Sequence, residues 1–348
     1  MPKELTHWYL AARCADRLAL SRTGSVPGEV LSRNVGAYLI GAIAPDILYY
    51  ARRAGRFRDA ADKVHGANGE NSYGFLSRLL PGQADSGERT GSREGIDPGL
   101  EQTFSLVCGI LTHIAADAMF HPLVYFYCGY SQGEEVGTQA PSESTERHWI
   151  FETCMDLYVR SMEESGESPR LSAMIGSSNV QRALLYRDLS LLFFGEPRKH
   201  RVPIEQALRR HARLQRIFES PVAARLLRLA ARRRSGVTRF LGLSYPAQRD
   251  RSLDAFRRTI VYTHPVTGET QHATFDDLVG RAVDAAVERI VALWDVTVNR
   301  GSQEDLAAWR GPSLETGLIA EPGTASGRLH TRSDLFSSFL PFRTEKSR

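Results

Sequence analysis

Residues 111–122, LTHIAADAMFHP, place three polar side chains in a stretch that is otherwise small, apolar and favourable to a helix. Successive residues of a helix turn by about 100°, so His113, Asp117 and His121 would lie within roughly 80° of one another, stacked over two turns. A helix of this kind must bury its apolar residues and its polar stripe together, against a neighbouring helix or in a cleft. The fold must therefore surround a buried polar site.

The spacing of apolar residues favours helices along most of the chain, and no run of alternating β-branched residues argues for a large sheet. We predict an all-α, multi-helix bundle. The predicted helices cover Thr6, as N-cap, to about Leu20; NVGAYLIGAIA as far as Pro45; a long stretch after the polar loop 81–99 that ends near Gly129; and ESTERHWIFETCMDLYVRSMEE. THPVTGETQHATFDDL predicts a small hairpin, followed by a helix that Thr270 or Thr274 caps.

Composition and cysteine spacing exclude several classes of protein. Apolar residues make up 42% and charged residues 24% of the 348 residues, which is typical of a folded globular chain. The four cysteines form no C-x-x-C pair, so neither a disulfide framework nor a thiolate zinc site is expected. Charges interrupt the apolar residues of the first 20 positions, and no later stretch is expected to approach the length of a transmembrane helix. We therefore expect a cytoplasmic protein.

The net charge is +4, and basic residues concentrate in the Arg-rich region 209–234. Its arginines are Arg209, Arg210, Arg213, Arg216, Arg225, Arg228, Arg232, Arg233 and Arg234. Such a cluster can contact phosphate groups, which suggests peripheral contact with a membrane, with nucleic acid as the less favoured partner. A solvated helix face without a partner is the simpler interpretation and stays open.

Five further residues extend the polar stripe of residues 113–121 into a candidate metal site. A buried ionised carboxylate between two imidazoles is costly unless a cation compensates it, and a metal ion also takes the imidazole lone pairs. His148 and Glu152 repeat the four-residue spacing in the next long helix, and His65, Asp46 and His7 come from earlier segments. For each histidine taken alone, a satisfied core residue is the alternative.

The other histidines have no carboxylate at helical spacing, and we predict no metal for them. They are His200, His211, His264, His272 and His330. His211 lies among arginines, which predicts a surface position. His264 precedes Pro265 in a turn, where it would support the turn or line the mouth of a cleft.

Five motifs occur in an order typical of one known family. THW, GAIAPD, DKVHG, LTHIAADAMFHP and RHWIFE follow one another within residues 1–160, and HPVTGE is a looser match further on. The chain thereby resembles the bacterial zinc-dependent phospholipase C family, whose fold is shared with single-strand-specific zinc nucleases. The resemblance implies a helical domain over residues 1–300 with a metal cluster at the base of a cleft. Residues 301–348 are expected to form a largely irregular tail.

The resemblance also implies a role for each candidate residue in a cluster of two or three Zn²⁺ ions. His65, His113 and Asp117 would hold the first ion, with Asp46 beside it as a ligand or as the carboxylate that orients the attacking water. His121, His148 and Glu152 would hold the second ion. His7 would hold the third, and Asp117 would bridge toward it.

The implied reaction is hydrolysis of a phosphodiester bond. A hydroxide shared by two zinc ions, with the pKa of its parent water lowered to about 7, would attack phosphorus, and Asp46 would act as base or aim the water. The substrate would carry a phospholipid headgroup or be a soluble phosphodiester.

Two departures from the family pattern limit what is carried over. Secreted members bind the third zinc partly through the amine and carbonyl of a terminal tryptophan, which this sequence lacks. We hypothesise that removal of Met1 leaves Pro2 as the terminal amine, five residues before His7, and that Pro2 chelates the third zinc. Ile47 follows Asp46 where the secreted phospholipase has a tyrosine near choline, so its headgroup preference is not assumed.

Two alternatives stay open. A nuclease or nucleotidase of the same fold would need aromatic side chains in the cleft to stack on bases, although core packing is the simpler role for them. The candidates are Trp8, Tyr9, Tyr49, Tyr50, Phe57 and Trp149. A zinc-stabilised binding protein without catalysis is the other alternative, but structural zinc sites usually have four protein ligands, more than each set here supplies.

Overall fold

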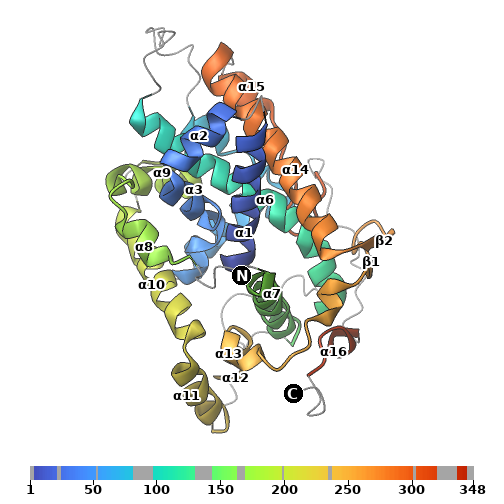
Figure 1. Cartoon of the computed structure of the whole chain (residues 1–348). Helices are drawn as coiled ribbons and strands as arrows, with labels where there is room; N and C mark the ends of the chain where they lie inside the picture. The colour runs from blue at the N-terminus through green and yellow to red at the C-terminus, as the bar shows by residue number, and fades with distance from the viewer. Residues whose placement is uncertain are drawn as a thin grey trace.

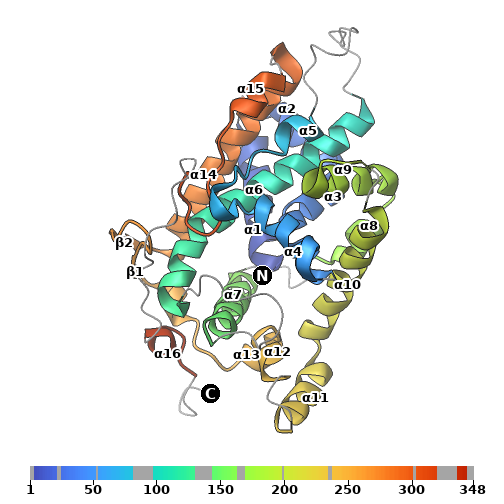
Figure 2. The same ribbon diagram turned by 180° about the vertical axis from the view of Figure 1, so that it is seen from behind.

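The computed structural model describes residues 4–21, 25–51, 54–80, 97–129, 143–162, 169–197, 200–233, 237–300, 303–319 and 335–342. Within these ranges the fold is all-α, as predicted, and the strands named are those of one short hairpin. Helices α1 (Glu4–Leu20), α3 (Val35–Gly41) and α14 (Phe275–Trp294) pack around the long central helix α6 (Pro98–Cys128) (Figure 1, Figure 2). Helix α7 (Glu143–Met162) crosses near the first turn of α1.

The remaining elements connect and cover this core. They are α2 (Ser25–Arg33), η1 (Ala44–Tyr50), α4 (Ala54–Val64), η2 (Ala67–Gly69), α5 (Leu76–Leu79), α8 (Leu171–Gly176), α9 (Arg182–Phe194), α10 (Arg201–Glu219), α11 (Pro221–Ala231), α12 (Thr238–Gly242), α13 (Tyr245–Gln248), η5 (Asp254–Arg257), β1 (Ile260–Thr263), β2 (Thr270–Ala273), η6 (Asp295–Arg300), α15 (Gln303–Ala308) and α16 (Phe336–Phe339).

Local sequence signals account for both ends of α6. The Asp97 side chain accepts hydrogen bonds from the backbone N–H groups of Gly99 and Leu100, and Pro98 occupies the first turn, where its missing N–H costs nothing. The helix ends at Gly129, whose φ of 82° favours glycine. By length and composition α6 could cross a membrane, contrary to the sequence-based expectation, but 83% of the window concerned is buried inside the protein. A helix surrounded by other helices is as apolar as a membrane span.

Helices α3 and α6 cross at two glycines. A Cβ on Gly109 would lie 2.0 Å from the backbone oxygen of Tyr38, and one on Gly41 would lie 2.1 Å from that of Leu106. Neither residue could carry a side chain without separating the two backbones. The close approach also brings the Ala42 carbonyl to the polar stripe of α6.

The predicted hairpin is present, and β1 pairs antiparallel with β2, with Ile260 opposite Ala273. Of the two candidate caps for the following helix, Thr274 is the one used. Its hydroxyl accepts from the N–H of Asp277, and the Asp277 carboxylate accepts from the N–H of Thr274. At α1 the prediction is wrong: the helix begins at Glu4, and Thr6 lies inside its first turn.

Parts of the expected C-terminal tail contribute to the core. Leu306 and Leu314 are buried, as are Phe336 and Leu340. The domain boundary at residue 300 stays a prediction, but the described residues beyond it pack on the helical bundle.

Candidate metal centre

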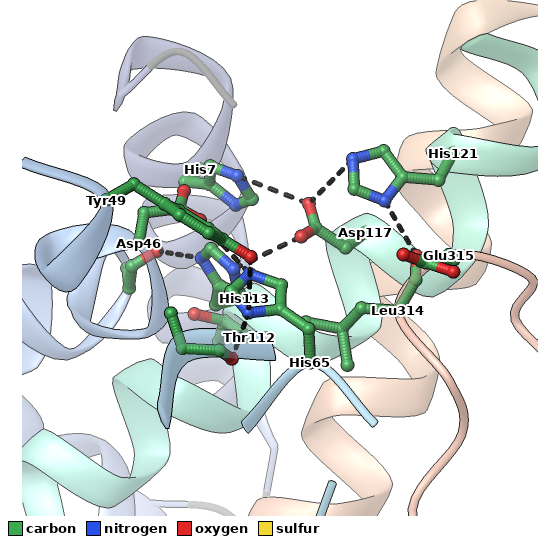
Figure 3. A network of polar contacts seen from close by, with 12 residues as sticks. His7, Asp46, Tyr49, His65, Thr112, His113, Asp117, His121, Leu314 and Glu315 are labelled. Carbon is green, nitrogen blue, oxygen red and sulfur yellow. Dashed lines mark hydrogen bonds and ion pairs between the residues drawn. The ribbon is translucent and has the colours of Figure 1, made fainter. Parts of the chain in front are cut away.

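Helix α6 presents the predicted stripe as one buried face. The two oxygens of the Asp117 carboxylate lie between imidazoles: Oδ2 is 3.2 Å from His113 Nε2, and Oδ1 is 3.4 Å from His7 Nε2 and 3.9 Å from His121 Nε2. Figure 3 shows Asp117 between His7 of α1 and His121 of α6. One carboxylate thus contacts three imidazoles.

Three of the histidines share one orientation. In each, Nδ1 contacts a backbone carbonyl oxygen, which only accepts hydrogen bonds, so Nδ1 carries a proton and Nε2 is the nitrogen that can bind a metal once it is deprotonated. Such carbonyl contacts fix the ring and the tautomer of metal-binding histidines. The pairs are His65 with Ala61 at 2.8 Å, His113 with Ala42 at 2.9 Å, and His121 with Leu314 at 2.7 Å.

The side chains form three groups, each with ligand atoms close enough to hold one metal ion. They are His7, His113 and Asp117; Asp46, His65 and His113; and His121, His148 and Glu152. The third group matches the set that the resemblance implied. The other two differ from it, because Asp46 stands beside His65 and His113 while Asp117 stands with His7. His113 therefore belongs to two groups.

A buried carboxylate on α7 fixes the first turn of α1. Asp156 accepts hydrogen bonds from the N–H groups of Leu5 and Thr6, from the Thr6 hydroxyl, and from the Tyr245 hydroxyl. These contacts satisfy N–H groups that the start of a helix leaves open. They hold His7 one residue further on, where its ring stacks on His113 at a centroid distance of 4.2 Å.

The electrostatics of the cluster favour a cation. Burial lowers the pKa of His7 to about 4, and the neighbouring His113 acts in the same direction. Burial also disfavours charge on His121, but Asp117 and Glu152 outweigh it and raise the pKa of His121 to about 9. Despite burial, the imidazoles around Asp117 hold the pKa of its carboxyl well below the usual range. Ionised carboxylates in this position need positive charge nearby.

The donor set fits a metal such as zinc. Nε2 of His113 and Nε2 of His121 are buried, and neither makes a well-aligned hydrogen bond with a residue that the structure describes. A buried nitrogen without a partner is costly, whereas coordination to a metal uses its lone pair. Imidazole nitrogens and carboxylate oxygens are ordinary zinc ligands, and the part of the chain that the structure describes places no cysteine in these groups.

A segment outside the sequence-derived site braces two of the groups. We call residues 311–319 the bracing segment. The Leu314 carbonyl accepts from His121 Nδ1, and the Leu314 N–H donates to the His65 carbonyl at 2.9 Å. His264 Nε2 donates to the Thr316 carbonyl at 2.9 Å, so the histidine after β1 holds the segment in place. Sequence patterns could not show this, since backbone atoms make these contacts with the metal-site histidines.

Gly317 of the bracing segment offers a direct test. Its φ is 70°, and a Cβ there would lie 2.2 Å from the Ala118 carbonyl oxygen of α6. Gly317→Ala is expected to displace the segment and to weaken zinc binding by roughly 10- to 100-fold, the usual effect of losing a contact that orients a metal ligand. The measurement is competition for zinc with a chelator of known affinity.

Gly195→Ala is the matched control for this change. Gly195 has a similar φ of 68°, but its Cβ would meet only the Arg78 side chain, at 3.7 Å. Both variants carry the same backbone strain, of about 1–2 kcal/mol. Equal zinc affinity in the two variants would show that the bracing segment does not orient the ligands.

The sequence-based expectations for His211 and His264 can also be compared with the structure. His211 is not on the surface: it is 1% exposed, its Nε2 lies 2.6 Å from Glu4 Oε1, and its ring stacks on Tyr50. The arginines around it in the sequence occupy other faces of α10. His264 supports a turn, as one of its two expected roles requires. Pro2, the hypothesised third-site ligand, lies outside the described residues.

A small pocket that is partly open to solvent adjoins the cluster. His7 and Asp117 line it together with His121 and Glu152, so it touches two of the three groups. The rest of the lining is mostly apolar: Thr6, Ala116, Phe120, Val124 and Met155. None of the six aromatics considered for base stacking lines this pocket.

The described residues form an all-α fold with three groups of imidazole and carboxylate side chains that could each hold a metal ion, beside a pocket. The chain matches the family model described as "Zinc dependent phospholipase C" over residues 6–198, more than half of its length. It therefore belongs to the zinc-dependent phospholipase C family, as the sequence motifs indicated. Neither a curated protein nor a solved structure matches it.

Proposed function

We propose that this protein is a zinc-dependent phosphodiesterase of the phospholipase C type, which cleaves a phospholipid between phosphorus and the glycerol oxygen. The observation that carries the proposal is the pocket, whose lining combines members of two groups of candidate zinc ligands with the apolar side chains of Phe120, Val124 and Met155. A substrate with a charged phosphodiester and an apolar body fits such a lining.

The three groups described above would hold the metal. We propose that each chain binds two or three zinc ions. When bound, zinc would supply Lewis acidity, which lowers the pKa of water and stabilises negative charge on the phosphoryl oxygens. The protein positions the ligands: backbone carbonyls fix His65, His113 and His121. Asp46, with Oδ1 at 3.1 Å from His65 Nε2, would hold a proton from the attacking water or orient that water.

None of the six aromatic residues considered for base stacking lines the pocket, which favours a lipid over a nucleic acid. Trp8 is buried, and its indole N–H donates to the Leu39 carbonyl, while Tyr50 is buried against His211. Such rings stabilise the core and offer bases no platform. A cytoplasmic location is also part of the proposal.

The test combines metal analysis with a panel of phosphodiesters. Zinc-loaded protein is expected to release a phosphorylated headgroup from short-chain phosphatidylcholine or another phospholipid, and Asp46→Asn is expected to lower kcat/KM by at least about 10²-fold. Asp59→Asn, an exposed change on α4, is the control and should leave kcat/KM unchanged.

The other members of the panel decide between the alternatives. Hydrolysis of single-stranded DNA or a 3′-nucleotide, but of no phospholipid, would establish the nuclease or nucleotidase. Zinc-loaded protein that cleaves no diester, including a bis-aryl phosphate, would establish a non-catalytic zinc protein. Absence of zinc from protein purified without chelators would overturn the whole proposal.

A further inference from the structure

Helix α11 exposes a row of large apolar side chains. Val222, Leu226 and Leu229 are 63%, 61% and 57% exposed, and their spacing of four and three residues places them on one face. Ala224, on the opposite face, is buried against the protein. The helix lies at the far end of the arm that α10 and α11 form (Figure 1, Figure 2). Most large apolar residues in the described part of the chain are at least partly buried, so a row of three exposed ones on one short helix needs a reason.

The charge around the row has one sign. Arg225, Arg228, Arg232 and Arg233 are exposed, and residues 220–233 contain no aspartate or glutamate. Arg225 and Arg232 flank the row on one side of the helix, and Arg233 continues it by one turn. An apolar stripe bordered by arginines is typical of helices that lie in the interface of an anionic membrane.

Two other binding partners of this face of α11 would account for fewer of its features. A second copy of the chain, docked through the same face, would bring two sets of arginines together with no acidic residue on the helix to neutralise them. A nucleic acid would engage the arginines but would leave Val222, Leu226 and Leu229 without a role.

We infer that α11 is a membrane-binding helix, which inserts its apolar row into the surface of an anionic lipid bilayer while its arginines contact lipid phosphates. This sharpens the sequence-based interpretation of the Arg-rich region. The apolar row, which arginine spacing did not reveal, sets the orientation of the helix. The inference goes beyond the proposed function and does not depend on hydrolysis. In this inference α11 contacts the bilayer, whereas hydrolysis would take place at the metal centre.

The test measures cosedimentation of the full chain with vesicles. The chain carries Asp46→Asn, which is expected to slow lipid hydrolysis and so to limit changes in the vesicles during the measurement. Binding to phosphatidylcholine vesicles that contain phosphatidylserine is expected, with much weaker binding to phosphatidylcholine alone and loss of binding at high salt. Leu226→Ser with Leu229→Ser should weaken binding to anionic vesicles at least fivefold. Arg225→Gln with Arg232→Gln should weaken it by roughly 30-fold, since each arginine contributes about fivefold.

Matched controls separate this surface from general effects of exposure and charge. Leu20→Ser removes an exposed leucine from the end of α1, and Arg13→Gln with Arg17→Gln removes two exposed charges from the same helix. Both controls should bind as the parent chain does. Unfolding by circular dichroism confirms that the α11 variants remain folded, as expected for exposed positions.

Several results would overturn the inference. One is absence of binding to anionic vesicles. Another is binding that the leucine pair does not affect, which would indicate a general affinity for polyanions. A third is a concentration-dependent dimer of the parent chain that the leucine pair abolishes, which would assign the face to a second copy. A phospholipase activity that fails while vesicle binding persists would refute the proposed function and leave this inference standing.

Discussion

Asp117→Asn is expected to lower kcat/KM for hydrolysis by at least about 10³-fold and to lower the zinc content of the protein. The Asp117 carboxylate contacts His7, His113 and His121 at once, so a neutral amide removes the negative charge that balances metal at the centre of the cluster. Removal of one preorganised electrostatic contact at a reacting centre already costs 10²- to 10³-fold. Asp117 is also one of the proposed metal ligands, so the loss should reach or exceed the upper value.

The structure predicts which zinc ion remains bound in the Asp117→Asn variant. The group of His121, His148 and Glu152 does not include Asp117, so it should keep its ion, whereas the group with His7 should lose it. Metal analysis and kcat/KM on one preparation measure both effects. Asp16→Asn, an exposed change on α1, should alter neither. Full zinc content with near-normal kcat/KM in Asp117→Asn would contradict the central position of this carboxylate.

Gly109→Ala is expected to cause the largest loss of stability among single methyl additions in the described core. The new Cβ would lie 2.0 Å from Tyr38 O and 2.7 Å from Ala42 N, both backbone atoms that cannot rotate away. Helices α3 and α6 would have to separate. We expect the free energy of unfolding to fall by about 3 kcal/mol, at the upper end of what overpacking usually costs.

The same change should affect the metal centre. Separation of α3 from α6 moves the Ala42 carbonyl away from His113 Nδ1, which it now contacts at 2.9 Å. Denaturant unfolding and chelator competition measure the two effects. Gly280→Ala is the control, because its Cβ meets nothing within 4 Å and alanine favours the interior of α14. If Gly109→Ala unfolds at the same denaturant concentration as Gly280→Ala, the close crossing is not required.

Several features of the fold could be predicted because they depend on local physics. Helical periodicity gave the all-α class, and the Thr274 and Asp277 pair marked the start of α14 by reciprocal hydrogen bonds. The turn residues after Thr263 predicted the hairpin. The prediction for Thr6 was wrong because threonine has the local chemistry of an N-cap. In the structure Asp156, 150 residues away in sequence, accepts the hydrogen bonds at the start of that helix instead.

The sequence by itself determined which residues are candidates for the site. His113, Asp117 and His121 share a face because a helix repeats every 3.6 residues, and His148 with Glu152 follows the same rule. The structure brings these five together with His7, Asp46 and His65. Their binding of zinc remains a prediction, which the family membership supports.

Only the tertiary structure decided how these residues are grouped and held. The pairing of Asp46 with His65, the bracing of His121 by Leu314, and the burial of His211 against Glu4 join segments far apart in the chain. The exposure of the apolar row on α11 was likewise invisible, because leucines among arginines fit a buried face as well as an exposed one. Periodicity fixes which side chains share a face of one helix, whereas packing between helices determines what that face meets.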